Sequence, residues 1–143
     1  MNKKELWLRL RDYHFDDLVP TGLWNNIQAH FSGVDASTKA FANKLATKYK
    51  WESAFALRAV WEYKKFVYLG VTSNYNVTPS KVIDQVWHQH ILFSRAYRKF
   101  CSDVIEYQFD HNPELLSFDN QTSIYSAQYG DTLDLYKKEF NQT

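Results

Sequence analysis

The segment from Thr78 to Cys101 concentrates the side chains of this chain that are best suited to chemistry. Its sequence, TPSKVIDQVWHQHILFSRAYRKFC, holds two of the five histidines and the only cysteine. Histidine binds metal ions and transfers protons near neutral pH. The segment therefore predicts either a functional site or a stretch of core with several polar groups.

The two histidines of this segment, His88 and His90, lie two residues apart. Each residue of a helix turns by about 100°, so these side chains point about 200° apart and cannot bind one ion from an unbroken helix. His90 falls beside an apolar stripe, and we expect a core histidine with one hydrogen-bonded ring nitrogen. The alternatives are a buried functional role, or a kink near the histidines that lets both rings converge. The stripe consists of Val86, Phe93, Tyr97 and Phe100.

His88 lies on the opposite side, one turn after Asp84, where side chains of a helix meet. A carboxylate that orients an imidazole supports proton transfer or metal binding, although a surface ion pair has the same spacing. His111, in FDHNPE, is a candidate third ligand from a loop. Asp84, His88 and His111 would form a two-histidine, one-carboxylate set that suits zinc or iron. The adjacent Asn112-Pro113 is equally typical of a turn.

Cys101 ends the apolar stripe, and we expect it to be a small buried hydrophobe. Trp87, His90 and Tyr97 are the other residues that we expect in this part of the core. A nucleophilic cysteine needs a base and an electropositive environment, and His90 lies too many turns away. A single cysteine also excludes an internal disulfide and the multi-cysteine zinc patterns. A phosphate-binding glycine loop, a serine elbow and HExxH are all missing from the sequence.

The elements that must position these residues are predicted to be helices. Only four glycines and three prolines interrupt the chain, and long stretches repeat with a period near 3.6 residues. We expect one all-α domain over residues 1–143, a bundle of five to seven helices around a central histidine-bearing helix. The expected helices cover residues 3–11, 23–31, a stretch around 41–49, 52–71, 78–101 and a final stretch striped by Tyr129, Leu133, Tyr136 and Phe140.

Several details of these helices are predicted as well. Asp35 or Ser37 is expected to cap the third helix. Thr78 is expected to cap the histidine helix, with Pro79 at its first position and a run to at least Cys101. In the fourth helix, Lys64 and Lys65 are expected away from the apolar side formed by Phe55, Ala59, Tyr63, Phe66, Val67 and Gly70. Residues 107–130 have the weakest helical pattern, and short β or irregular structure is the alternative to a helix there.

Composition narrows the classes of partner. The formal net charge is +1, which gives no large field to attract nucleic acid or an anionic membrane. The sequence has no apolar run long enough for a transmembrane helix and no signal-peptide pattern, so we expect a cytoplasmic protein. Aromatic residues make up 17% of the chain. Those left exposed favour a protein partner, and the candidates are Tyr13, Trp24, Trp61, Tyr68 and Tyr75.

Taken in order along the chain, several motifs form a recognisable series. They are ELW and FDD, FANKLATKYKW, EYKKFVYLGV, VTPSKVIDQVWHQHILFSRAYRKFC, HNP and YGDTLDLYKKEF. In these motifs the chain resembles bacterial relatives of the glycine-rich-domain-containing protein-like family. The resemblance implies an all-helical fold and a signature formed by Asp84, Trp87, His88, His90, Tyr97 and Cys101. It implies no particular reaction. The chain departs from the pattern at Asp110-His111, where paired histidines would be usual.

Two hypotheses for the function follow, and the sequence leaves open whether the protein is an enzyme. The first is a protein-interaction module, favoured by small size, near-zero charge and the lack of a complete catalytic motif. The alternative is a metal- or acid/base-dependent enzyme that uses Asp84, His88 and His111. A divalent metal such as zinc would be the cofactor. A homodimer is also plausible, because twofold dimers are the commonest oligomers.

Overall fold

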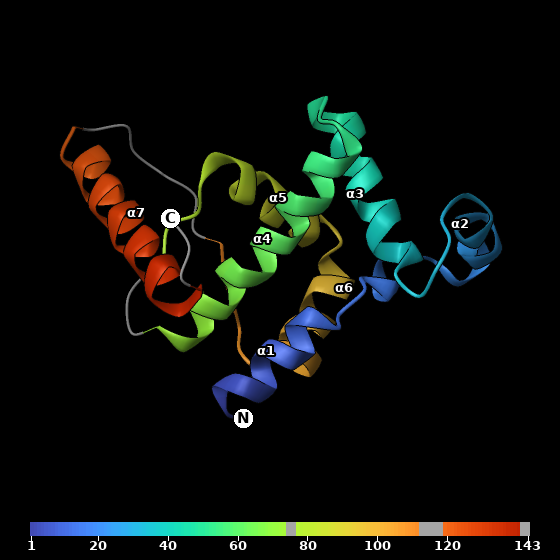
Figure 1. Ribbon diagram of the computed structural model, residues 1–143, viewed down its shortest axis with the longest axis horizontal. Helices are drawn as coiled ribbons and strands as arrows, with labels where there is room; N and C mark the ends of the chain where they lie inside the picture. The colour runs from blue at the N-terminus through green and yellow to red at the C-terminus, as the bar shows by residue number, and fades with distance from the viewer. Residues whose placement is uncertain (74–76, 112–118, 141–143) are drawn as a thin grey trace.

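The computed structural model describes the backbone of residues 1–73, 77–111 and 119–140, and the side chains of these residues except 119–129 (Figure 1). These residues contain helices and no strand, so the predicted all-α, single-domain class is confirmed, as is the expected five to seven helices. The seven α-helices are α1 (Lys3–Arg11), α2 (Trp24–His30), α3 (Ala36–Tyr49), α4 (Ser53–Thr72), α5 (Lys81–Leu92), α6 (Ser94–Lys99) and α7 (Asp119–Phe140). Shorter turns are η1 (Asp16–Leu18), η2 (Thr21–Leu23) and the π-helical η3 (Phe100–Ile105).

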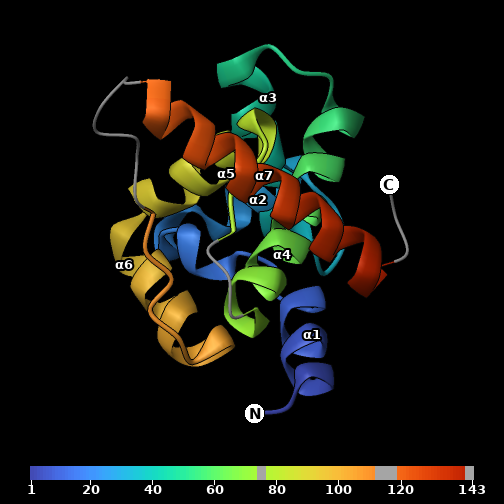
Figure 2. The same cartoon turned by 90° about the vertical axis from the view of Figure 1, so that its left-hand side faces the viewer.

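Helix α4 is the axis of the fold, because α1, α3, α5 and α7 all pack against it (Figures 1 and 2). Its side chains join one hydrophobic cluster with residues from most of the other helices. The prediction that Lys64 and Lys65 lie away from the packed side is wrong, because neighbours cover α4 on more than one side and both lysines are buried. Lys64 Nζ donates to the carbonyl oxygens of Arg11 at 3.2 Å and Tyr13 at 2.6 Å. Burial lowers its pKa to about 8.

The helix boundaries agree closely with the periodicity for α1 to α4. The first predicted helix has the observed bounds, and the next three are shifted by no more than a few residues. Two local predictions are wrong. Asp35 is the residue before α3, but neither it nor Ser37 forms a side-chain cap there. Phe55 has an exposed side chain because it lies in the first turn of α4, beyond the reach of the core.

The histidine helix differs from its prediction at both ends. Its N-cap is Ser80, whose Oγ accepts from the backbone N–H of Ile83 at 3.2 Å, so Thr78 and Pro79 lie before the helix. It does not run to Cys101, because Phe93 has φ −84° and ψ 67° and interrupts it. The ring of Phe93 packs edge-on against Phe41 of α3, with ring centroids 6.5 Å apart. The sequence has neither glycine nor proline at this point, so its local pattern gives no sign of the interruption.

Helix α7 packs with a different stripe from the predicted one. Thr132 is buried and its Oγ1 accepts from the Thr78 backbone N–H at 2.7 Å, whereas Leu133 is exposed. Tyr136 and Phe140 pack against the core as predicted, and the side chain of Tyr129 lies outside the described residues. Contact with α4 sets the rotation of α7, and the apolar spacing alone does not reveal it. Within the described residues, no helix combines the length and hydropathy needed to cross a bilayer.

Candidate functional site

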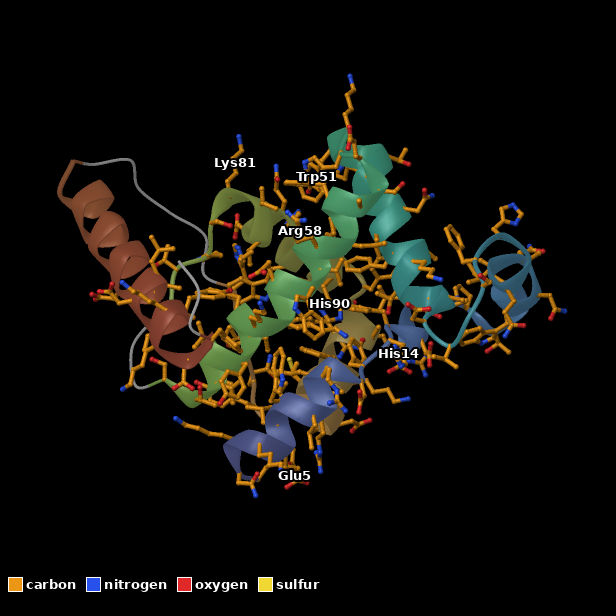
Figure 3. All side chains as sticks on the ribbon, viewed as in Figure 1. Glu5, His14, Trp51, Arg58, Lys81 and His90 are labelled. Atoms are coloured by element: carbon orange, nitrogen blue, oxygen red, sulfur yellow. The ribbon has the colours of Figure 1, made fainter. Side chains whose placement is uncertain are left out.

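His90 lies at the centre of the core, as the helical spacing predicts (Figure 3). Its Nδ1 is 2.7 Å from the hydroxyl of Tyr63 and its Nε2 is 3.4 Å from the hydroxyl of Tyr13. Burial lowers the pKa of His90 to about 3, so the ring is neutral. A neutral imidazole has one donor and one acceptor, so one tyrosine donates to it and the other accepts from it. Both ring nitrogens therefore have partners, where the sequence predicted one.

Aromatic rings enclose this histidine. Tyr97 lies edge-on to His90 at 5.0 Å between ring centroids, and Phe100 lies at 4.8 Å. Both come from the chain after the break at Phe93, so the break turns these rings back toward α5. Apolar walls of this kind leave no water to stabilise an imidazolium, and this explains the low pKa. The remaining rings in contact with His90 are Tyr13, Phe15, Phe41 and Tyr63.

A second chain of hydrogen bonds begins at Trp87. Its Nε1–H donates to the hydroxyl of Tyr97 at 2.9 Å, and that hydroxyl donates to the backbone carbonyl of Phe109. The indole also stacks on the Phe109 ring, with centroids 4.7 Å apart and planes 19° apart. The polar atoms of Trp87 and Tyr97 are thus satisfied inside the protein, in a network that orders the segment after η3.

Cys101 is buried at the start of the π-helical turn, as expected for a small hydrophobe. Burial raises the pKa of its thiol, and hydrogen bonds with Phe109 and Tyr97 only partly offset this effect. Reactive cysteines have a lowered pKa and an accessible sulfur. The geometry of Cys101 therefore fits a structural role.

The structure brings together two of the three residues of the predicted polar site. His111 Nε2 lies 2.5 Å from Asp84 Oδ1, and the imidazole packs edge-on against Trp87 at 4.6 Å. Nearly half of the Asp84 side chain is exposed, against 18% for His111. A histidine–carboxylate pair with an accessible edge can accept and return a proton.

The third residue, His88, is exposed on the outer side of α5. The residues that the structure describes contain no group of three or more His, Cys, Asp or Glu side chains placed to hold a metal ion. The sequence correctly separated His88 from His90, but it paired Asp84 with His88, whereas Asp84 bonds to His111. That pairing depends on where the chain returns after η3, which helical spacing cannot reveal. Metal binding by the three residues stays a prediction.

The aromatic residues expected at a partner surface differ in how exposed their side chains are. Tyr68 is buried, and Tyr13 is half-buried with its hydroxyl toward His90. Trp24 is half-buried, Trp61 is 38% exposed, and Tyr75 lies outside the described residues. Sequence reasoning instead missed Tyr49, Trp51 and Phe55, which form a ladder of ring contacts at the turn between α3 and α4. The close spacing of three aromatic residues around a helix boundary was the available signal.

A comparison with known protein families identifies the family of this chain. A family model described as UCP032817-like matches residues 29–125, more than half of the chain, including α5, Tyr63 and His111 but not Tyr13. Neither the curated proteins nor the solved structures contain a significant match. The resemblance to the glycine-rich-domain-containing protein-like family is therefore wrong, because apolar stripes and aromatic landmarks recur in many helical cores. The chain belongs to the UCP032817-like family.

Proposed function

We propose that this protein is a protein-interaction module that binds its partner on the outer side of α5 and α3. The inner side of α5 has no polar atoms left for a partner, so the outer side is the candidate for binding. The polar atoms of Trp87, His90 and Tyr97 all have partners inside the core, so they serve the fold. The outer side instead presents exposed His88 and Leu92, followed by half-buried Phe93.

The observation that carries the proposal is an apolar strip beside these residues. The strip is the row of ring contacts formed by Tyr49, Trp51 and Phe55, in which Phe55 is 44% exposed. Leu92 on α5 is 60% exposed although it is aliphatic. Tyr49 links α3 to α5, because its hydroxyl accepts from Gln89 Nε2 at 3.1 Å. The ring of Tyr49 also stacks on Trp51. Exposed apolar side chains that adjoin one another are typical of contact surfaces.

A photoreactive amino acid at position 92 tests the proposal in living cells. We expect ultraviolet light to produce a discrete cross-linked adduct with another protein. The same amino acid at position 133, exposed to a similar degree on α7, is the control and should give none. Equal cross-linking at both positions, or none at position 92, would refute an interaction surface on α5.

The second candidate is an acid/base enzyme that uses the Asp84–His111 pair, with His88 as a third residue if a metal such as zinc is bound. The short contact between Asp84 and His111 and the exposed edge of Asp84 support it. Metal analysis of protein purified without a histidine tag, followed by His88→Ala and His111→Ala, tests the metal form. Stoichiometric zinc that is lost in both variants, with the fold intact, would favour the enzyme. The same metal content in the wild type and in both variants would exclude these ligands.

A further inference from the structure

The near-zero net charge of the chain conceals a strong separation of charge. Residues 36–50 and 81–99 together carry eight Lys or Arg and one acidic residue, Asp84. The rest of the chain carries nine basic and fifteen acidic residues. The two basic segments are α3 with its following residue, and α5 with α6. Two of the eight cations pair with carboxylates from outside these segments, Lys39 with Asp35 and Lys99 with Asp17, so the remaining cations carry the excess positive charge.

The cations of α3 border the outer side of α5. Lys44 Nζ lies 5.5 Å from the centroid of the Phe93 ring, and Lys48 Nζ lies 5.9 Å from that of Tyr49. Neither lysine forms an ion pair within the part of the chain that the structure describes. Both lysines are exposed, so their ammonium groups remain accessible beside these rings.

The exposed residues of α5 lie in its last two turns, shortly before Phe93 in the chain. Gln89 contacts Tyr49 of α3, and Leu92 lies about 60° from Gln89 around α5. His88 lies about 40° farther round, at the outer edge of this surface. We call the combined surface the α3–α5 face, and it consists of Lys44, Lys48, Tyr49, His88, Leu92 and Phe93.

We infer that the α3–α5 face binds an acidic, amphipathic helix of a partner protein. The inference rests on the proposed interaction function and names the chemistry of the partner. An apolar row on that helix would cover Leu92 and the edge of Phe93, and flanking carboxylates would pair with Lys44 and Lys48. Amphipathic helices dock in this way through residues one turn apart. The twelve residues of α5 span about 18 Å, which matches three to four turns of a partner helix.

The same features disfavour a nucleic acid as the occupant. Single-stranded nucleic acids stack their bases on open aromatic rings. Here the Phe93 and Tyr49 rings are half-buried, and the most exposed apolar residue of the face is an aliphatic leucine. Phosphates would leave Leu92 uncovered, whereas an apolar helix row would bury it.

Selection from a displayed library of random 16-residue peptides on the immobilised full chain tests the inference. We expect the enriched peptides to combine Glu or Asp with Leu, Ile or Phe at helical spacing. The double variant Lys44→Glu/Lys48→Glu should bind them at least ten times more weakly and should itself select basic peptides. Leu92→Asp should also weaken binding at least tenfold. Lys137→Glu/Lys138→Glu, exposed on α7, is the matched control and should bind as the wild type does.

The outcomes separate the two proposals. Cross-linking at position 92 together with enrichment of neutral or basic peptides would leave the interaction function standing and overturn the acidic partner. Failure to enrich any peptide would also overturn it. Binding of a 20-nucleotide single strand that Lys44→Glu/Lys48→Glu abolishes, without enrichment of acidic peptides, would replace the partner by a nucleic acid. Self-association in sedimentation that Leu92→Asp abolishes would replace it by a second copy of the chain.

Discussion

The two sides of α5 use similar residue types for opposite purposes. On the inner side, His90 has no exposed surface, is neutral and has a tyrosine at each ring nitrogen. On the outer side, His88 is two residues away and exposed. A buried polar group must form its hydrogen bonds within the fold, whereas an exposed group can stay hydrogen-bonded to water until a ligand displaces that water. The residue type therefore does not decide the role; the side of the helix does.

The largest expected effect concerns the phenylalanines of the two environments. Phe109→Ala should lower the free energy of unfolding by about 3–5 kcal/mol, because it removes the ring that stacks on Trp87 and leaves a cavity. Phe55→Ala, on the exposed strip, should cost less than about 1 kcal/mol. Urea denaturation of both variants measures the difference, and equal losses would contradict the division between core and strip.

A glycine on α4 sharpens the same comparison. A Cβ on Gly70 would lie 2.2 Å from the Phe109 ring, so Gly70→Ala should cost about 2–3 kcal/mol through overpacking. The control is Gly130→Ala in α7, where a Cβ meets nothing within 4 Å. This control should gain about 0.5–1 kcal/mol from helix propensity. Thermal unfolding of the pair tests the close packing of Phe109 on α4, and a stabilised Gly70→Ala would show that the ring is not there.

The two histidines of α5 provide the most direct test. His90→Ala should lower the free energy of unfolding by about 1–3 kcal/mol, because the hydroxyls of Tyr13 and Tyr63 lose their partner. His88→Ala should change it by less than about 0.5 kcal/mol. Denaturant titration of both variants measures these two changes in the free energy of unfolding. Similar losses for both histidines would mean that His88 also has a structural role.

The pH dependence of stability isolates the buried histidine. The pKa of His90 is about 3 in the fold against an ordinary value of 6.5, so the unfolded chain binds the proton first as the pH falls. The stability that neutral His90 provides is fully present above about pH 6.5 and is lost as the pH falls toward 3. Between pH 5.5 and 4, the wild type should lose about 1.4 kcal/mol per pH unit more than His90→Gln. If the free energy of unfolding depended on pH in the same way for both proteins, His90 would be exposed to water in the folded state.

The sequence was sufficient where local periodicity controls the outcome. Residues 3–11 form the predicted helix, and the period near 3.6 correctly placed His90 with Val86 and Tyr97 inside and His88 outside. A side chain's direction around a helix depends only on its number, so one sequence determines it. The same reasoning failed at Phe93, where the helix is interrupted and the ring packs against Phe41, 52 residues earlier in the chain.

What the sequence by itself determined is therefore the all-α class and the division of α5 into an inner and an outer side. Only the tertiary structure decided which distant residues complete each side. It placed Tyr13 and Tyr63 at His90, His111 at Asp84, and Lys44 of α3 beside the Phe93 ring. Such pairs are separated by tens of residues, and their meeting depends on how whole helices pack. The net charge of +1 likewise gave no sign of the two exposed lysines on the α3–α5 face, because a sum over the chain contains no information about position.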